Sequence, residues 1–226
     1  MLPLLLQMQK AAPYLRLVFF WFPVVYLSLL IAYNSLPYFT FTGEQPFILD
    51  KENIRGNSFW FVNFYIHVAA GIIALLAALT QFSSNILKKR LQIHKVAGKI
   101  YVLLVLVVAA PTGMLLAFFA KGGLWGGLGF GILSILWFYT TLMGLLKIKK
   151  GDVDGHVQWM IRSYALTLSA LTFRLFHMGF HFLEFNDTTN YILSLWASNV
   201  FNILAAELVV YNYKRKIYSL SKNNNT

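Results

Sequence analysis

Apolar residues gather in six long windows that follow one another along almost the whole chain. Each window is close to the roughly 20 residues that an α-helix needs to cross the hydrocarbon core of a bilayer. The windows lie at about 15–33, 59–81, 96–119, 127–147, 156–182 and 189–211. The pattern therefore predicts an all-α, polytopic transmembrane bundle of six helices, in a single integral membrane domain over residues 1–226 with a polar tail at 212–226.

Composition supports this prediction and narrows the chemistry. The chain is 58% hydrophobic and 12% charged, whereas a soluble domain has about a quarter of its residues charged. It has no cysteine, which excludes disulfides, cysteine-ligated iron–sulfur clusters and covalently attached c-type haem. A bound metal would therefore have to use histidine, methionine or carboxylate ligands.

The basic residues are unevenly distributed between the two sides of the predicted bundle. Most of the 19 Lys and Arg residues lie in the N-terminal segment, the second and fourth connections and the tail, whereas Lys51, Arg55 and Lys121 lie in the alternate connections. The positive-inside rule then predicts that both termini are cytoplasmic. The first window follows Lys10 and Arg16 and has no clear cleavage site, so we expect an uncleaved helix. We expect a protein of the bacterial inner membrane. Its net charge is +11, and we expect its basic residues to contact anionic lipid headgroups rather than nucleic acid.

The fifth window carries an unusual number of polar and ionisable residues for a membrane helix. Those residues recur at alternating spacings of four and three, so they form one continuous stripe along a helix. The stripe must face the bundle interior, because hydroxyl and guanidinium groups that faced lipid would remain unsatisfied. The stripe consists of His156, Met160, Ser163, Thr167, Ala170, Arg174, His177 and His181.

The predicted topology gives each end of the stripe a histidine partner on another helix. His94, at the start of the third helix, is predicted to be level with His156, and His67, in the second helix, with His177 and His181. These residues form an inner pair and an outer group of candidate haem ligands, since neutral imidazole binds haem iron well. His67 and His94 are each followed four residues later by a glycine, which leaves room for a partner helix or a flat ring.

Two arginines lie in the same window and need partners. Arg162 is at a depth similar to that of Glu207, the only acid embedded in an apolar window, which predicts a structural ion pair. Arg174 lies on the stripe with no embedded acid at its depth. A lone arginine near the midplane costs about 2.5–3.5 kcal/mol, so we expect a compensating anion or acceptor. A haem propionate, a quinone oxygen or the carboxylate of Glu184 would serve.

Two segments carry a resemblance to a known family. IHKVAGKIYVL (93–103) and GDVDGHVQWMIRSYALTLSALTFR (151–174) are similar to segments of the bacterial membrane-protein family called domain of unknown function 2306. That resemblance implies a polytopic inner-membrane protein and points to His94, His156, Arg162 and Arg174, without an established activity. The general arrangement also resembles cytochrome b561-type proteins, whose helix bundles hold two b haems between histidines near both membrane surfaces.

Three functions are compatible with these residues. The leading hypothesis is a b-type cytochrome that relays electrons across the membrane through bis-histidine haem, with a quinone or a redox protein as partner. The second is a copper or zinc protein, which requires His67, His177 and His181 to converge. The third is a cofactor-free transporter or structural subunit, in which the stripe lines a polar cavity. Hydrolysis is disfavoured, because the chain has no H-E-x-x-H motif and no paired intramembrane carboxylates.

Overall fold

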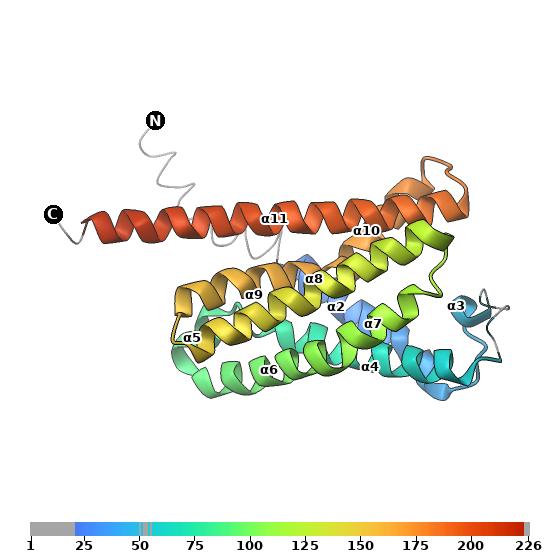
Figure 1. Cartoon of the computed structure of the whole chain (residues 1–226), viewed down its shortest axis with the longest axis horizontal. Coiled ribbons are helices and arrows are strands. Elements are labelled where there is room, and N and C mark those ends of the chain that lie inside the picture. Colours follow the sequence, from blue (N-terminus) through green and yellow to red (C-terminus); the bar gives the residue numbers. More distant parts are fainter. Residues whose placement is uncertain (1–20, 50, 52–53, 55, 224–226) are drawn as a thin grey trace.

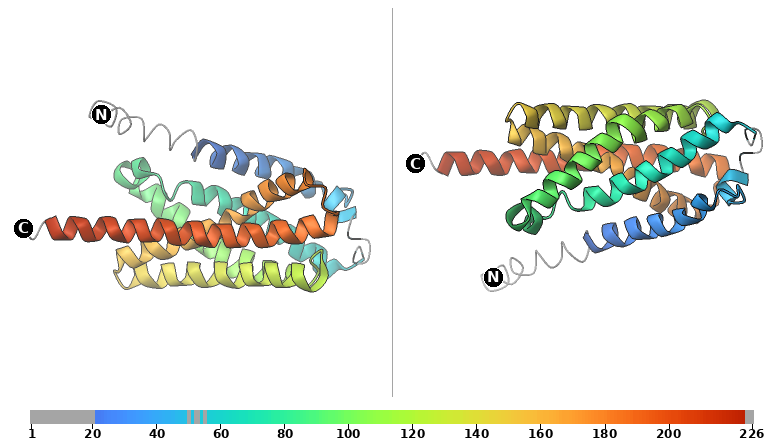
Figure 2. Two further views of the ribbon diagram at one scale, coloured as in Figure 1. Left: turned by 90° about the horizontal axis from the view of Figure 1, so that it is seen from above. Right: turned by 90° about the horizontal axis from the view of Figure 1, so that it is seen from below.

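The computed structural model describes residues 21–49, 51, 54 and 56–223. Every regular element in these residues is helical, and the long helices run side by side along the long axis of the molecule (Figures 1 and 2). Five segments of the described chain are long and apolar enough to cross a membrane: Phe22–Thr40, Ser58–Leu79, Leu91–Ala117, Gly123–Lys149 and Asp187–Ser219. The protein is therefore a helical membrane protein.

The two ends of the bundle differ in composition. One end holds the short helix α5 (Ser84–Lys89), the turn after α8 (Gly123–Lys149) and the C-terminal part of α11 (Asp187–Asn223), as Figure 1 shows. The opposite end holds α3 (Pro46–Leu49) and the connections that precede α8 and α11. We call the end with α5 the basic end, because lysines are concentrated in the connections after α4 and after α8 that lie there. We call the end with α3 the loop end.

The first two spans are close to the prediction. The first is α2 (Phe22–Ser35), which continues as a 3₁₀ turn over Leu36–Thr40, and the predicted residues 15–20 lie outside the described part of the chain. The second is α4 (Ser58–Leu79). Asn57 caps α4 by accepting a hydrogen bond from the Trp60 N–H at 3.1 Å, which satisfies one of the free donors at a helix N-terminus.

The third span is interrupted where the sequence places proline inside a helix. It consists of α6 (Leu91–Leu103), a π-helical segment over Leu104–Ala109, and α7 (Ala110–Ala117), which begins with Pro111 at its second position. Proline has no N–H and its ring crowds the preceding turn. A π-helical segment is one way in which a helix accommodates such a defect.

The glycine-rich segment before the fourth span is mostly helical. Helix α8 begins at Gly123, ahead of the predicted start at 127, and ends at Lys149. Gly126, Gly129 and Gly131 are buried within it. A Cβ atom on Gly129 would lie 2.6 Å from Leu195 of α11, so this glycine allows α8 and α11 to approach closely.

The predicted fifth helix consists of two consecutive helices. Neither is long enough to cross a membrane alone, so the described residues contain five helices of sufficient length rather than the predicted six. Helix α9 (Val153–Thr167) and helix α10 (Ser169–His181) are separated at Leu168. At this break the Thr167 hydroxyl donates to the Ser163 carbonyl at 3.0 Å, and the Leu171 N–H bonds to the Leu168 carbonyl three residues back. Hydroxyl groups that occupy backbone carbonyls loosen the regular helical pattern.

The last helix is longer than the prediction. Helix α11 runs from Asp187 to Asn223 without a break, so most of the predicted polar tail is helical. Its 37 residues span roughly 55 Å, well beyond the thickness of about 30 Å of a hydrocarbon core. The helix therefore extends out of the bilayer at the basic end.

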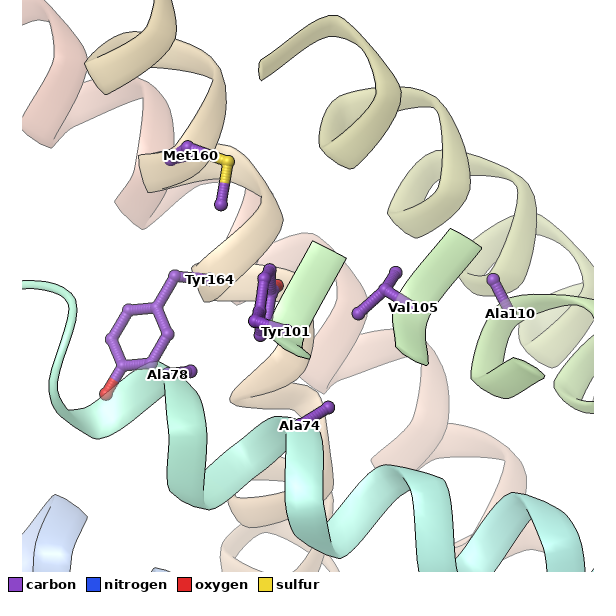
Figure 3. Packing of buried hydrophobic residues seen from close by; sticks show 7 residues of the cluster. All are labelled: Ala74, Ala78, Tyr101, Val105, Ala110, Met160 and Tyr164. Carbon is purple, nitrogen blue, oxygen red and sulfur yellow. The ribbon is translucent and has the colours of Figure 1, made fainter. Parts of the chain in front are cut away.

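The main core lies where α4, α6, the π-helical segment and α9 meet. Small side chains of α4 pack against the rings of Tyr101 and Tyr164 (Figure 3). Tyr101 is only 1% exposed. Small residues at these contacts allow the helix backbones to approach closely. The buried members of this cluster are Ala74, Ala78, Tyr101, Val105, Ala110, Met160 and Tyr164.

Candidate functional site

Two histidines lie at the same depth at the basic end. His94 is the fourth residue of α6 and His156 is the fourth residue of α9. Both helices begin at this end, so each side chain lies roughly 5 Å along its helix from the start. Both residues are half-buried, and the two imidazoles are close enough to interact electrostatically.

The imidazole of His156 has a fixed tautomer. Its Nδ1 atom lies 2.8 Å from the Gly144 carbonyl oxygen of α8. A carbonyl can only accept, so Nδ1 must carry the proton, and the neutral ring leaves the lone pair of Nε2 free. A metal-binding histidine typically has this arrangement, with the second nitrogen held by a backbone carbonyl.

The start of α9 is held by a cap beneath His156. The Asp152 carboxylate accepts from the Lys147 ammonium at 2.9 Å and from the Gly155 N–H at 2.8 Å. The bond from Lys147, and then that from Gly155, holds the pKa of Asp152 below its ordinary value of 3.8. The cap ties the end of α8 to the first turn of α9, and so fixes the position of His156 relative to Gly144.

His94 has the complementary property. Its Nδ1 atom is buried and has no hydrogen-bond partner among the described residues. An unsatisfied buried polar atom is uncommon in native proteins and calls for an explanation such as a bound water or ion. The basic end thus has one histidine with a free Nε2 and one with a free, buried Nδ1.

The histidines of the predicted outer group have separate contacts. His67 is nine residues into α4 from the loop end, roughly 14 Å along the axis, whereas His177 is four residues before the end of α10, roughly 6 Å. His67 Nδ1 lies 2.9 Å from the Ala109 carbonyl oxygen and 3.2 Å from the Thr112 hydroxyl. Its tautomer is fixed like that of His156.

His177 and His181 do not join His67 in one group. The His177 ring stacks on Phe173 at 5.8 Å and meets Tyr191 edge-on at 6.5 Å, and its buried Nδ1 has no partner in the described chain. His181 is exposed. No three His, Asp or Glu side chains of the described residues form a group able to hold a metal ion.

A cavity of about 440 Å³ lies inside the bundle towards the loop end. It is lined by parts of α2, α3, α4, α7, α8, α9, α10 and α11 and is open on one side. His67, Lys51 and Arg174 are its basic residues, and no carboxylate of the described residues lines it. Most of the wall is apolar, and its aromatic residues are Phe47, Trp60, Phe64, Phe119, Phe130, Trp137, Phe173 and Tyr191. We call it the central cavity.

Arg174 faces this cavity without an acidic partner. Its Nη1 donates to the Ala170 carbonyl at 2.6 Å in its own helix, and the charge interacts with Tyr38 and Tyr191. The described part of the chain offers it no carboxylate within ion-pair distance, Glu184 included. The anion or acceptor expected for Arg174 is therefore not supplied by these residues.

Arg162 has its partner in α11. Its Nε lies 2.6 Å from Glu207 Oε1 and its Nη2 lies 2.9 Å from Oε2. The guanidinium also lies 4.8 Å from the ring centre of Trp159. A bidentate pair has a defined geometry, so this contact fixes the rotation of α9 against α11.

A buried hydroxyl cluster joins α6, α8 and α9. The Tyr101 hydroxyl lies 2.6 Å from the Ser163 hydroxyl and 2.7 Å from that of Thr167, and the Trp137 indole donates to both Tyr101 and Thr167. Thr141 completes the cluster with a bond of 2.6 Å to Ser163. Tyr101, Trp137 and Thr141 are not among the site residues predicted from the sequence.

A signal for the cluster exists in the sequence. Ser163 and Thr167 belong to the polar stripe, and Tyr101 follows His94 by seven residues, which puts both on one face of α6. A membrane helix that turns a hydroxyl stripe inward requires hydrogen-bonding partners on its neighbours. Tyr101 is the polar residue of the third window best placed to supply them.

The chain belongs to the DUF2306 family of predicted membrane proteins, whose match covers residues 64–210. All five histidines lie within the matched region, together with Arg162, Arg174 and Glu207. No curated protein and no solved structure matches the chain. Family membership thus agrees with the resemblance of the two sequence segments and leaves the function to be argued from the site.

Proposed function

We propose that this DUF2306 protein is a membrane-embedded b-type cytochrome that holds haem between His94 and His156 at the basic end. The observation that carries the proposal is the complementary state of two imidazoles at one depth. His156 has its Nδ1 bonded to the Gly144 carbonyl and its Nε2 free, whereas His94 has a buried Nδ1 without a partner. Two free ring nitrogens on separate helices are the donor set of a bis-histidine haem.

The residues around this pair fit a haem group. The buried Nδ1 of His94 has no hydrogen-bond partner among the described residues, which supports the presence of a bound group or water at this end. The lysines and arginine at the same end, Lys88, Lys89, Arg90, Lys147 and Lys149 among them, supply positive charge for propionates. Absence of cysteine makes a non-covalent b-type group the consistent choice. When bound, haem supplies reversible one-electron chemistry that the side chains of this protein lack.

The chain itself would hold and orient the ligands. The Gly144 carbonyl keeps His156 in one tautomer and one ring orientation, and the Asp152 cap keeps α9 in register with α8. The hydroxyl cluster of Tyr101, Ser163 and Thr141 holds α6, α8 and α9 together below the two histidines. Side chains that are locked in this way give a preorganised site.

We also propose the finer topology. Helices α9 and α10 together have 28 residues, enough to cross a bilayer once as a bent span, which gives six spans. An even number of spans leaves both termini on one side, and the basic connections identify that side as the cytoplasm of a bacterial inner membrane. The partners would be a quinone or a redox protein, together with the lipid bilayer.

The rival functions make different demands. A copper or zinc site on His67, His177 and His181 needs these residues to converge, and they form no such group in the described structure. A cofactor-free transporter would use the central cavity as a polar path. The size of the cavity and its two cations, Lys51 and Arg174, are the observations that favour a transporter.

Haem content in matched variants tests the proposal. Protein purified from haem-replete cells is assayed by pyridine haemochrome for wild type, His94→Ala, His156→Ala and His181→Ala. We expect about one haem per chain in wild type and in His181→Ala, whose histidine is exposed, and loss of haem in the other two. A full haem complement in His94→Ala and His156→Ala would refute the assignment of these ligands.

A further inference from the structure

We propose that the central cavity binds the ring of a membrane quinol, the reduced form of a membrane quinone. The inference rests on the proposed function for the fate of the electrons, because it makes the quinol the redox partner of the cytochrome. The binding itself depends only on residues of the cavity. Its wall joins an apolar, aromatic surface to a small number of polar groups, which is the usual composition of a small-molecule site.

The size and walls of the cavity suit a substituted ring. Its volume of about 440 Å³ is within the range of about 300–1,000 Å³ of ligand pockets. Trp60 and Phe64 of α4, which stack on each other with ring centres 5.1 Å apart, and Phe130 and Trp137 of α8 line the cavity. An aromatic wall packs favourably against a ring. Gly71 lies in the wall with no atom within 4 Å of the position of a Cβ.

The two central polar groups have opposite hydrogen-bonding character. Arg174 can only donate, and no carboxylate of the described residues neutralises it. Neutral His67 has its proton on Nδ1, bonded to the Ala109 carbonyl, so its remaining nitrogen can only accept. A quinol offers a hydroxyl that donates to His67 and an oxygen that accepts from Arg174.

This combination favours a quinol over an anionic amphiphile, and over the oxidised quinone, whose two carbonyls can only accept. A carboxylate or phosphate head has acceptors only, so it would match Arg174 but would place a lone pair against the bare nitrogen of His67. Lys51, the other cation of the wall, donates to the Phe119 carbonyl at 2.6 Å. This bond holds its ammonium group near the loop end. The acceptor and donor on opposite helices, α4 and α10, therefore indicate a ligand that has both functions.

The cavity is also connected to the helix that carries His94. Trp137 and Thr167 line the cavity and both bond to Tyr101 of α6. Tyr101 is seven residues from His94, roughly 10 Å along the helix axis. A quinol in the cavity would thus be separated from the proposed haem ligand by about two helical turns of packed protein.

Binding is tested directly in the full chain, in nanodiscs of neutral lipid, by titration with decylubiquinol under reducing conditions. Tryptophan fluorescence is a suitable signal, because Trp60 and Trp137 line the cavity. We expect saturable binding. Gly71→Leu fills the cavity and should abolish saturation, while Arg174→Gln should weaken binding roughly tenfold or more, as expected for loss of a charged hydrogen bond. The same titration of haem-free protein separates quinol binding from the haem proposal.

Two controls complete the design. Gly179→Leu adds the same side chain at another open position of a helix, outside the cavity, and should leave binding unchanged. Lys121→Gln removes a loop-end cation that pairs with Asp187 and should also have no effect. Absence of saturable binding, or equal binding in Gly71→Leu, overturns the proposal. Saturable binding of laurate that excludes decylubiquinol overturns it as well and identifies an anion site.

Discussion

The Nδ1 atom of His156 donates a hydrogen bond to the Gly144 carbonyl oxygen at 2.8 Å, across the interface between α9 and α8. This contact determines which nitrogen of the ring is available to a ligand. His67 has an equivalent contact with the Ala109 carbonyl. Each of the two proposed sites, the haem site at the basic end and the quinol site in the central cavity, therefore contains one histidine with a fixed tautomer.

The hydroxyl cluster predicts a contrast between two buried tyrosines. Tyr101→Phe removes a hydroxyl that bonds to Ser163, Thr167 and Trp137 and takes one hydrogen bond from each of them, which should cost about 0.5–1.5 kcal/mol per bond. The hydroxyl of Tyr164 is buried without a partner in the described chain, so Tyr164→Phe should be neutral or stabilising. Thermal unfolding in detergent compares the variants, and equal destabilisation by both would contradict the role given to the cluster.

The pair between Arg162 and Glu207 predicts non-additive effects on stability. Glu207→Gln leaves the arginine charge uncompensated and should destabilise the protein by about 1–2 kcal/mol, the upper range for polar contacts between membrane helices. The double variant with Arg162→Gln should recover much of that loss, because both charges are gone. Unfolding of the four proteins of the cycle measures the coupling. Strictly additive losses would show that the contact contributes nothing.

The cap on α9 predicts a dependence of stability on pH. Lys147 and the Gly155 N–H hold the pKa of Asp152 below 3.8, its ordinary value. A carboxyl group with a lowered folded pKa contributes stability above its unfolded pKa and loses that contribution as the pH falls through the folded one. Asp152→Ala should therefore melt below wild type at neutral pH, and the difference should disappear below about pH 3 to 4. A constant difference across this range would indicate another cause.

The topology predicts opposite labelling at the two ends. The chain has no native cysteine, so single cysteines can be introduced and labelled without background. A cysteine at Lys149, at the basic end, should react with an impermeant maleimide only after the cells are opened. A cysteine at Lys121, at the loop end, should react in intact cells. The reverse result would show that the termini are not cytoplasmic.

Hydropathy predicts most of this fold because each span is long and apolar. It fails at Leu168, where the Thr167 hydroxyl donates to the Ser163 carbonyl and the fifth span is divided. It also fails at the end of α11, which continues as a helix where hydropathy stops. Periodicity predicts the inward face of α9, since Met160, Ser163 and Thr167 are buried. Neither signal measures interactions between helices.

The candidate site could be predicted only in part for the same reason. The depth of His94 and His156 follows from their positions near the starts of two helices. The separate contacts of His67 and His177 depend on how α4 and α10 pack against their neighbours, which the sequence does not specify. The tautomers and the unpartnered nitrogens depend on residues of other helices, such as Gly144 for His156 and Ala109 for His67.

A dithionite-reduced minus oxidised visible spectrum of the wild-type protein, purified from haem-replete cells, tests the central claim most directly. The account predicts a sharp α band of a b-type haem, which is absent from protein that carries His94→Ala or His156→Ala. A protein without visible absorbance would contradict it, and the pair at the basic end would then have to be explained without haem.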